Sequence, residues 1–238
     1  MIGDYRRMKR LPIYETFYSW QGEGCHMGKS AFFIRLFGCP IKCPWCDSAG
    51  TWHPDFVPDS VDKLSIEDLV AQAKEHNPSM VVITGGEPCI HDLSDLTDSL
   101  HESGLRVHLE TAGAHTIRGA FDWITLSPKE WKHPAPENLE LASEFKVIVD
   151  KPETINFWEK KIGSQYSDRP VWLNPEWSKR NDPEILGRIN AAVKKGKYAY
   201  RAGYQMHKLY QVDEEDSRSK PVIDLSLPPL DKSTLNHF

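Results

Sequence analysis

The sequence lacks any hydrophobic run long enough to cross a membrane, and no apolar core follows its first residues. A spanning helix needs about 20 apolar residues, and a secretory signal has an apolar segment of its own. The chain also lacks an excess of basic charge: 29 Lys and Arg face 34 Asp and Glu, with the signs interspersed and a net charge of -5. We therefore expect a cytoplasmic protein that binds neither a membrane nor nucleic acid.

Cysteine is scarce as well, with five residues in a chain of 238. Three of the five are clustered, which fits thiols kept reduced for a metal better than it fits a disulfide framework. The composition is 39% hydrophobic and 26% charged, which is typical of a chain with a packed core. The length suits a single domain of the larger kind.

The clustered cysteines are Cys39, Cys43 and Cys46, which follow the apolar run 31–37. Prolines between them stiffen the loop. A structural zinc ion closes its tetrahedron with four protein ligands, whereas a four-iron cluster held by three cysteines leaves one iron open for chemistry. Three thiols at this spacing therefore favour an iron–sulfur cluster.

Other interpretations of these cysteines stay open on spacing alone. The thiols can form a zinc clip completed by a fourth ligand, for which the candidates are His26, His53 and Cys25. They can also be small buried residues without a ligand role. Cys25 and Cys89 by themselves indicate ordinary loop or buried positions.

Strand and helix patterns alternate along most of the chain. Predicted strands cover residues 12–20, 31–37, 80–84, 105–111, 123–126, 145–149 and 171–173. Predicted helices follow the capping-box signal at 65–68 and cover about 93–100, 154–161 and 184–195. The stretch 198–211 is typical of a last strand followed by a polar turn. This order predicts an α/β fold with a mainly parallel sheet.

The domain organisation changes near residue 211. We expect residues 1–211 to form the folded domain and residues 212–238 to form an irregular C-terminal extension. The extension begins with the acidic run 213–216 and contains several prolines, a composition that favours neither helix nor strand. It is predicted to pack on the surface or to be disordered.

Polar residues recur where the predicted strands end, which is the edge at which catalytic groups collect in parallel α/β folds. The cysteine loop follows the first core strand. The series continues with 85–88 after the second, Glu110 in the third, Ser127 and Lys129 after the fourth, and Asn174 after the sixth. We therefore expect one site on one face of the sheet.

The cysteine loop and the turn Gly85-Gly86-Glu87-Pro88 together resemble the radical S-adenosylmethionine (SAM) superfamily. In that superfamily such a turn presents backbone oxygens to the amino group of SAM, and its glycines let the backbone approach the ligand. Over residues 13–211 the sequence is similar, more specifically, to the 7-carboxy-7-deazaguanine synthase family. The motifs that carry this similarity are QGEG at 21–24, FIRLFGCP at 33–40, CD at 46–47, VVITGGEPCIHD at 81–92, SPK at 127–129 and QMHK at 205–208.

This resemblance implies a partial (β/α) barrel and a lyase of queuosine and 7-deazapurine biosynthesis. The implied reaction converts 6-carboxy-5,6,7,8-tetrahydropterin to 7-carboxy-7-deazaguanine with loss of ammonia, after a 5'-deoxyadenosyl radical has taken the hydrogen at C6. The implied cofactors are a 4Fe-4S cluster, SAM and Mg²⁺. The implied partners are an electron donor such as flavodoxin or ferredoxin and a second copy of the chain in a homodimer.

The resemblance also assigns roles to individual residues. The implied metal ligands are Cys39, Cys43 and Cys46 for the cluster and Ser48 for Mg²⁺. The implied SAM-binding residues are Gly85, Gly86, Glu87, Glu110, Ser127 and Lys129. The implied pterin-binding residues are Gln21, Glu23, Arg35, Thr84 and His207, and the catalytic ones among them are His207, Glu23 and Arg35. An amide and a carboxylate suit the pyrimidine edge of a pterin, and an arginine suits its carboxylate.

Several positions depart from the family's pattern. Ser48 stands where the family has a threonine, Trp20 where a smaller apolar residue is expected, and Asn174 where a glutamine is common. The chain also continues well beyond the QMHK motif, near which many members end. If a chain terminus helps to close the site in those members, this chain must close it differently.

Other functions and roles remain to be weighed. A glycyl-radical-enzyme activase shares the cysteine spacing and the Gly-Gly-Glu-Pro turn, and a zinc or iron–sulfur scaffold needs only the cysteines. From its position alone, Arg35 fits two roles equally well: it can pair with a carboxylate of the protein, or it can bind a carboxylate of the substrate. By the same reasoning Glu23 fits a solvated loop acid, and His207 fits a surface or satisfied core histidine.

Overall fold

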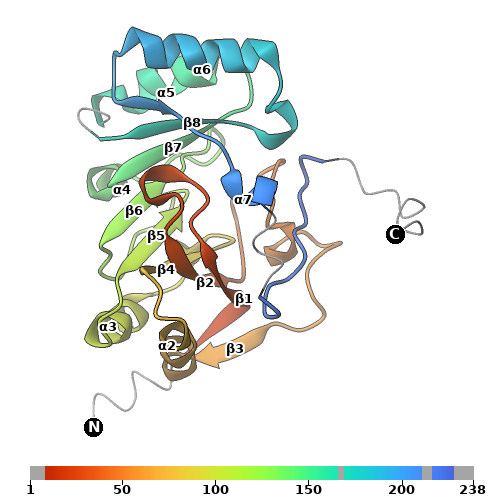
Figure 1. Ribbon diagram of the computed structural model, residues 1–238, viewed down its shortest axis with the longest axis vertical. Coiled ribbons are helices and arrows are strands. Elements are labelled where there is room, and N and C mark those ends of the chain that lie inside the picture. Colours follow the sequence, from red (N-terminus) through yellow and green to blue (C-terminus); the bar gives the residue numbers. More distant parts are fainter. Residues whose placement is uncertain (1–8, 166–168, 211–215, 228–238) are drawn as a thin grey trace.

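A nine-stranded sheet forms the centre of the computed structural model, which describes residues 9–165, 169–210 and 216–227 (Figure 1). The strands lie in the order β3-β1-β2-β4-β5-β6-β7-β8-β9. Their bounds are β1 Arg10–Trp20, β2 Ser30–Leu36, β3 Asp62–Ser65, β4 Met80–Gly85, β5 Val107–Thr111, β6 Trp123–Leu126, β7 Glu144–Val149, β8 Val171–Pro175 and β9 Tyr200–Ala202. From β2 to β9 all neighbours pair in parallel, whereas β1 runs antiparallel to β2 and β3.

Helices cover the outer face of this curved sheet. The α-helices are α2 Ile66–Glu75, α3 Ser94–Glu102, α4 Pro136–Leu141, α5 Thr154–Ile162, α6 Pro183–Lys195 and α7 Met206–Tyr210. Short 3₁₀ turns are η1 Gly24–His26, η2 Ala49–Thr51, η3 Pro88–Ile90, η4 Gly163–Gln165 and η5 Trp177–Lys179. In Figure 1, α2 and α3 lie outside the β1–β5 half and α5 and α6 lie outside the other half.

Alternation along the strands separates an apolar outer face from a polar inner one, because successive side chains of a strand point to opposite sides. Ile34, Ile83 and Leu109 are neighbours across β2, β4 and β5 and belong to a buried cluster shared with α2 and α3. The next residue of each strand therefore faces inward, and these residues are Arg35, Thr84 and Glu110. A second cluster lies between β6–β9 and the helices α4, α5 and α6.

The α/β class and the mainly parallel sheet are confirmed, and the sheet is open, with β3 and β9 at its edges within the described residues. The predicted capping box at the start of α2 is also present, with Ser65 Oγ accepting from Asp68 N at 3.1 Å. The prediction for 198–211 was wrong in part. A three-residue strand is followed by helix α7 rather than by a polar turn, and residue 211 lies outside the described residues.

The C-terminal extension runs beside the loop that contains the cysteines (Figure 1). Its described part, residues 216–227, has no helix and pairs with the domain through an isolated parallel bridge between Ile223 and Ser48. The division into a domain and an extension stays a prediction, since 211–215 and 228–238 lie outside the described residues. Within the described ranges, none of the helices is long and apolar enough to span a membrane.

Candidate active site

The cysteine loop and the glycine turn are bonded to each other through their backbones. Gly86 N donates to Leu36 O at 3.0 Å, and Glu87 N donates to Gly38 O at 2.9 Å. A Cβ on Gly86 would lie 2.3 Å from Gly38 O and 2.7 Å from Cys39 Cβ, which no side chain tolerates. The two motifs that follow β2 and β4 therefore form one unit.

Two further features fix this turn. Gly85 has a φ of 150°, and a Cβ there would lie 2.4 Å from Leu36 O, so the position requires glycine. The Glu87 carboxylate is buried and accepts hydrogen bonds from Cys89 N (3.0 Å), Thr111 Oγ1 (2.6 Å) and Ala112 N (2.9 Å). Glu87 thus ties the turn to the end of β5, and its side chain is engaged in structure.

The three clustered thiols are half-buried, and desolvation raises the pKa of each; for Cys46 it is raised to about 12. The Lys129 ammonium acts in the opposite direction on Cys39 and Cys43. A thiolate is the form that binds metal, so burial at this site calls for a cationic centre that offsets the cost. Cysteine thiolates are the ligands that iron–sulfur clusters take, so this set of three donors fits such a cluster.

The zinc clip considered above finds no support among the described residues. None of their His, Cys, Asp and Glu side chains come together in a group of three that could hold one metal ion. His26 packs edge-on against His108 and Trp123, and Cys25 Sγ accepts from Arg201 Nη1 at 3.3 Å. A four-iron cluster spreads its cysteines over separate irons and does not need such convergence.

A charged network joins strands β5 and β7 to the loop that follows β1. Lys146 of β7 pairs with Glu23 and, at 2.7 Å, with Glu110 of β5. Gln21 Nε2 donates to Glu110 Oε1 at 3.1 Å. Glu23 Oε1 is buried and has no hydrogen-bond partner in the described part of the chain, so it offers an acceptor to a ligand.

The two carboxylates on Lys146 titrate differently. Burial raises the pKa of both, but at Glu23 the Lys146 ammonium, with a smaller contribution from His207, outweighs burial and the pKa is lowered. At Glu110, burial and the repulsion from the Glu23 carboxylate raise the pKa by more than the attraction of Lys146 lowers it, so the pKa is raised. Glu23 is therefore the better ionised acceptor, while Glu110 is the group more easily kept neutral.

Glycines let the loop of Glu23 meet its neighbours closely. A Cβ on Gly22 would lie 2.4 Å from His207 Nδ1, so the imidazole of α7 packs directly on the loop backbone. Gly24 has a φ of 71° and faces Glu144, whose Oε2 accepts from Cys25 N at 2.9 Å. Sequence reasoning did not identify Glu144, although a carboxylate next to a predicted buried strand is a usable signal.

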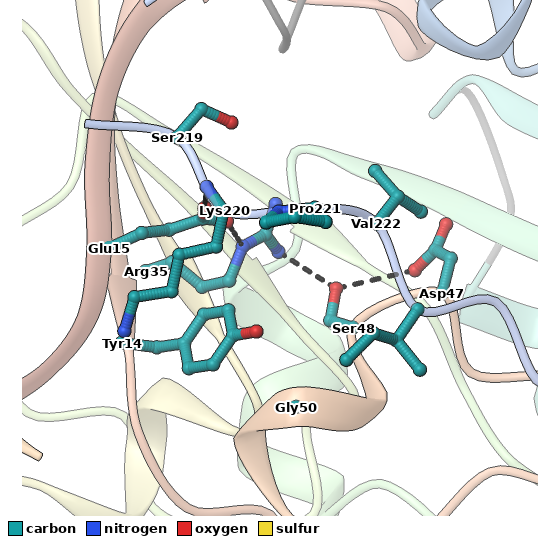
Figure 2. A pocket seen from close by; sticks show the side chains of 11 residues that line it. Tyr14, Glu15, Arg35, Asp47, Ser48, Gly50, Ser219, Lys220, Pro221 and Val222 are labelled. Carbon is teal, nitrogen blue, oxygen red and sulfur yellow. Dashed lines mark hydrogen bonds and ion pairs between the residues drawn. The ribbon is translucent and has the colours of Figure 1, made fainter. Parts of the chain in front are cut away.

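Arg35 forms an ion pair with a carboxylate of the protein, which is one of the two roles that its position in a strand allows. Its Nε lies 2.6 Å from Glu15 Oε1, and its Nη1 donates to Ser48 Oγ at 3.0 Å (Figure 2). Ser48 Oγ lies 3.4 Å from Asp47 Oδ1. The predicted pterin-binding and Mg²⁺-binding residues are thus brought into contact. Thr84 pairs with Arg35 in register across β2 and β4.

The C-terminal extension covers Arg35 from the side. Residues 219–223 line a cavity together with Tyr14, Glu15, Arg35 and Ser48 (Figure 2). Its volume is about 20 Å³, enough for one water molecule. Lys220 N donates to Glu15 Oε2 at 2.5 Å, so the extension bonds to the same carboxylate as Arg35 does.

The remaining predicted residues lie after β6. Lys129 Nζ donates to Ser127 O (2.6 Å) and Ser127 Oγ (2.8 Å), and burial lowers its pKa. The contacts described above thus join the predicted cofactor-binding and substrate-binding residues into local groups. The roles of these residues in binding and catalysis stay predictions. Sequence reasoning assigned no role to Lys146, which was visible as a lysine inside the apolar strand 145–149. It likewise assigned none to Glu15, Asp47 and Lys208.

Comparison with known proteins gives a consistent result. A family model described as the Radical SAM superfamily matches residues 33–132. The 7-carboxy-7-deazaguanine synthase of Synechocystis sp. is 48% identical over 166 residues, which are 70% of this chain and 78% of that one. The enzyme of the same name from Escherichia coli K12 is 37% identical over 85% of this chain and 99% of its own. The crystal structure of QueE from Escherichia coli matches with a TM-score of 0.73 at 32% identity, covering 87% of this chain and 99% of that chain.

Proposed function

Because the chain belongs to the 7-carboxy-7-deazaguanine synthase family of radical SAM enzymes, we propose that it converts 6-carboxy-5,6,7,8-tetrahydropterin to 7-carboxy-7-deazaguanine with release of ammonia. The observation that carries this proposal is the buried, unpartnered oxygen of Glu23 beside Gln21 and His207. An amide with an adjacent carboxylate acceptor matches the amino-pyrimidine edge of a pterin.

The cofactors of this family have a place among the residues at the strand ends. Cys39, Cys43 and Cys46 would hold the 4Fe-4S cluster, and the backbone of the 85–88 turn would meet SAM. When bound, the cluster and SAM supply a one-electron cleavage that yields a hydrogen-abstracting radical. The protein supplies orientation: the turn and the loop are hydrogen-bonded to each other, so the residues that would hold the cluster and SAM keep a fixed relation to one another.

The substrate would be held from several elements. Gln21 and Glu23 bind the pyrimidine edge, and the Arg35 guanidinium meets the pterin carboxylate while Glu15 keeps its orientation. The Thr84 hydroxyl, next to Arg35 in register, adds a neutral hydrogen bond. His207, whose imidazole packs on the Gly22 backbone, carries protons to and from the substrate.

Mg²⁺ binding is the part of the proposal that needs a rearrangement. Ser48 Oγ and Asp47 Oδ1 offer two hard oxygens 3.4 Å apart, which is chemistry that Mg²⁺ accepts. Arg35 Nη1 donates to the same Ser48 hydroxyl, so a cation there requires Nη1 to give up this hydrogen bond while Nε stays on Glu15.

The remaining parts of the proposal concern partners and setting. We propose a cytoplasmic homodimer that receives its electron from a flavodoxin or ferredoxin. The domain spans 1–211, and the extension spans 212–238. Family membership favours the synthase over an activase or a scaffold, since the named relatives above are synthases.

The deciding experiment is anaerobic incubation of the cluster-loaded protein with SAM, a reductant and the carboxypterin, followed by mass spectrometry. We expect the deazaguanine product in wild type and its loss in Cys43→Ala, together with loss of bound iron. A fully loaded protein that cleaves SAM but forms no such product overturns the proposal. Zinc at one per chain without iron or sulfide overturns the cluster assignment.

A further inference from the structure

The C-terminal extension contributes a buried carboxylate that the proposed function does not use. The Asp224 side chain is 7% exposed, and its Oδ2 lies 2.5 Å from Lys208 Nζ. Lys208, 10% exposed, also pairs with Asp47 Oδ2 at 3.3 Å. One lysine thus connects the extension with the residue that follows the cluster-ligand candidate Cys46.

The backbone on both sides of Asp224 is bonded to the cysteine loop. Leu225 N donates to Cys46 O at 2.8 Å, and Ile223 O accepts from Ala49 N at 3.3 Å. The other carboxylate oxygen, Oδ1, accepts from Ser226 N at 2.9 Å. The position and the orientation of the carboxylate are therefore both fixed against the loop.

Lys208 of the Lys208–Asp224 pair belongs to helix α7, which is too short to be stable by itself. It has five residues, and a helix of this length is unstable without tertiary contacts. The contacts that hold it include Met206 N to Gly22 O (3.2 Å), the two ion pairs of Lys208 and an edge-on contact of Tyr210 with Trp20. Just before the helix, Gln205 Nε2 donates to Asp47 Oδ2 at 3.1 Å. Because His207 lies between Met206 and Lys208, these contacts also place its imidazole.

We propose that Asp224 is a positioning residue: through Lys208 it holds helix α7, and with it His207, against the Cys46–Asp47 stretch in the arrangement that binds the pterin. The inference rests on the proposed function. Without the Asp224 carboxylate, the buried Lys208 ammonium keeps only Asp47 as its counter-ion among the described residues, and it draws the Asp47 carboxylate away from Gln205. The extension then has a role in the site in addition to covering it.

The first test needs neither cofactor nor substrate. Amide hydrogen exchange of residues 206–210 is measured in the iron-free protein for wild type, Asp224→Asn, Asp224→Glu and Lys208→Gln. We expect exchange about tenfold faster in Asp224→Asn and Lys208→Gln and a return toward wild type in Asp224→Glu. The control is Asp95→Asn, which removes the carboxylate of a surface ion pair with Lys9 and should leave these amides unchanged. Unchanged exchange in a folded Asp224→Asn protein overturns the proposal.

The second test uses the loaded enzyme and separates binding from chemistry. In Asp224→Asn we expect KM for the carboxypterin to rise about tenfold, with iron content and substrate-independent SAM cleavage as in wild type. The double variant Asp224→Asn/Lys208→Gln should be no worse than Lys208→Gln; independent, additive losses contradict action through Lys208. If wild type makes no deazaguanine, the proposed function fails, while the exchange experiment still decides on positioning.

Discussion

The two parts of the site are held in different ways. The unit of cysteine loop and glycine turn is fixed by backbone hydrogen bonds and by glycines at which an added Cβ would lie less than 3 Å from neighbouring atoms. The part formed by Gln21, Glu23, Glu110 and Lys146 is fixed by charged side chains. A backbone frame gives the same geometry whenever the local sequence is kept, whereas a charged network depends on every member. The first part suits cofactors common to a superfamily, and the second suits a particular substrate.

The largest expected effect is the loss of stability on removing Lys146, the cation at the centre of the charged part. In Lys146→Met, two buried carboxylates lose their shared counter-ion, and we expect a loss of about 3–5 kcal/mol in the free energy of unfolding. The measurement is chemical denaturation of the iron-free protein. Lys9→Met, which breaks the partly exposed pair with Asp95, is the control and should cost less than about 1 kcal/mol. Equal losses in both variants would mean that the network adds no stability.

Adding one methyl group tests the backbone-held part. A Cβ on Gly86 would press on Gly38 O and Cys39 Cβ, so Gly86→Ala should cost about 1–3 kcal/mol and reduce the iron bound after reconstitution. Gly187 is the matched control, because a Cβ in that position of α6 meets nothing within 4 Å. Gly187→Ala should leave the iron content unchanged and stabilise the helix slightly. Full iron loading of Gly86→Ala would show that the turn and the loop can separate.

The same contrast explains what could be predicted from the sequence. The backbone-held unit was predictable because its signals, three cysteines and Gly85-Gly86, are local and demand particular residue types. The strand ends were predictable from apolar runs such as 145–149. Lys146 was not assigned, because nothing in a lysine's position in the sequence says which carboxylates a folded sheet brings to it. The path of the extension was out of reach for the same reason: its contacts, such as Leu225 with Cys46, are long-range.

A conservative change at Arg35 sharpens the role of the charged part in binding. Lysine keeps the charge but loses the planar fork, which can hold Glu15 and a substrate carboxylate together. For Arg35→Lys we expect about tenfold weaker pterin binding, equivalent to about 1.4 kcal/mol, with the cluster spectrum unchanged. Binding is measured by titration of the SAM-loaded enzyme under anaerobic conditions. Wild-type affinity in this variant would assign Arg35 to structure alone.

The smallest effect concerns the start of the described extension, where Asp216 accepts from Tyr18 N at 2.8 Å and pairs with Arg218 at 3.0 Å. Burial would raise the pKa of this carboxyl, but these hydrogen bonds and the Arg218 charge lower it to about 2. Its stabilising contribution is therefore complete above the unfolded value of 3.8 and is lost as the pH falls toward 2. The urea midpoint should fall more steeply from pH 6 to pH 3 in wild type than in Asp216→Asn, whose side chain does not titrate. Parallel pH profiles would show that charge at this position does not hold the extension in place.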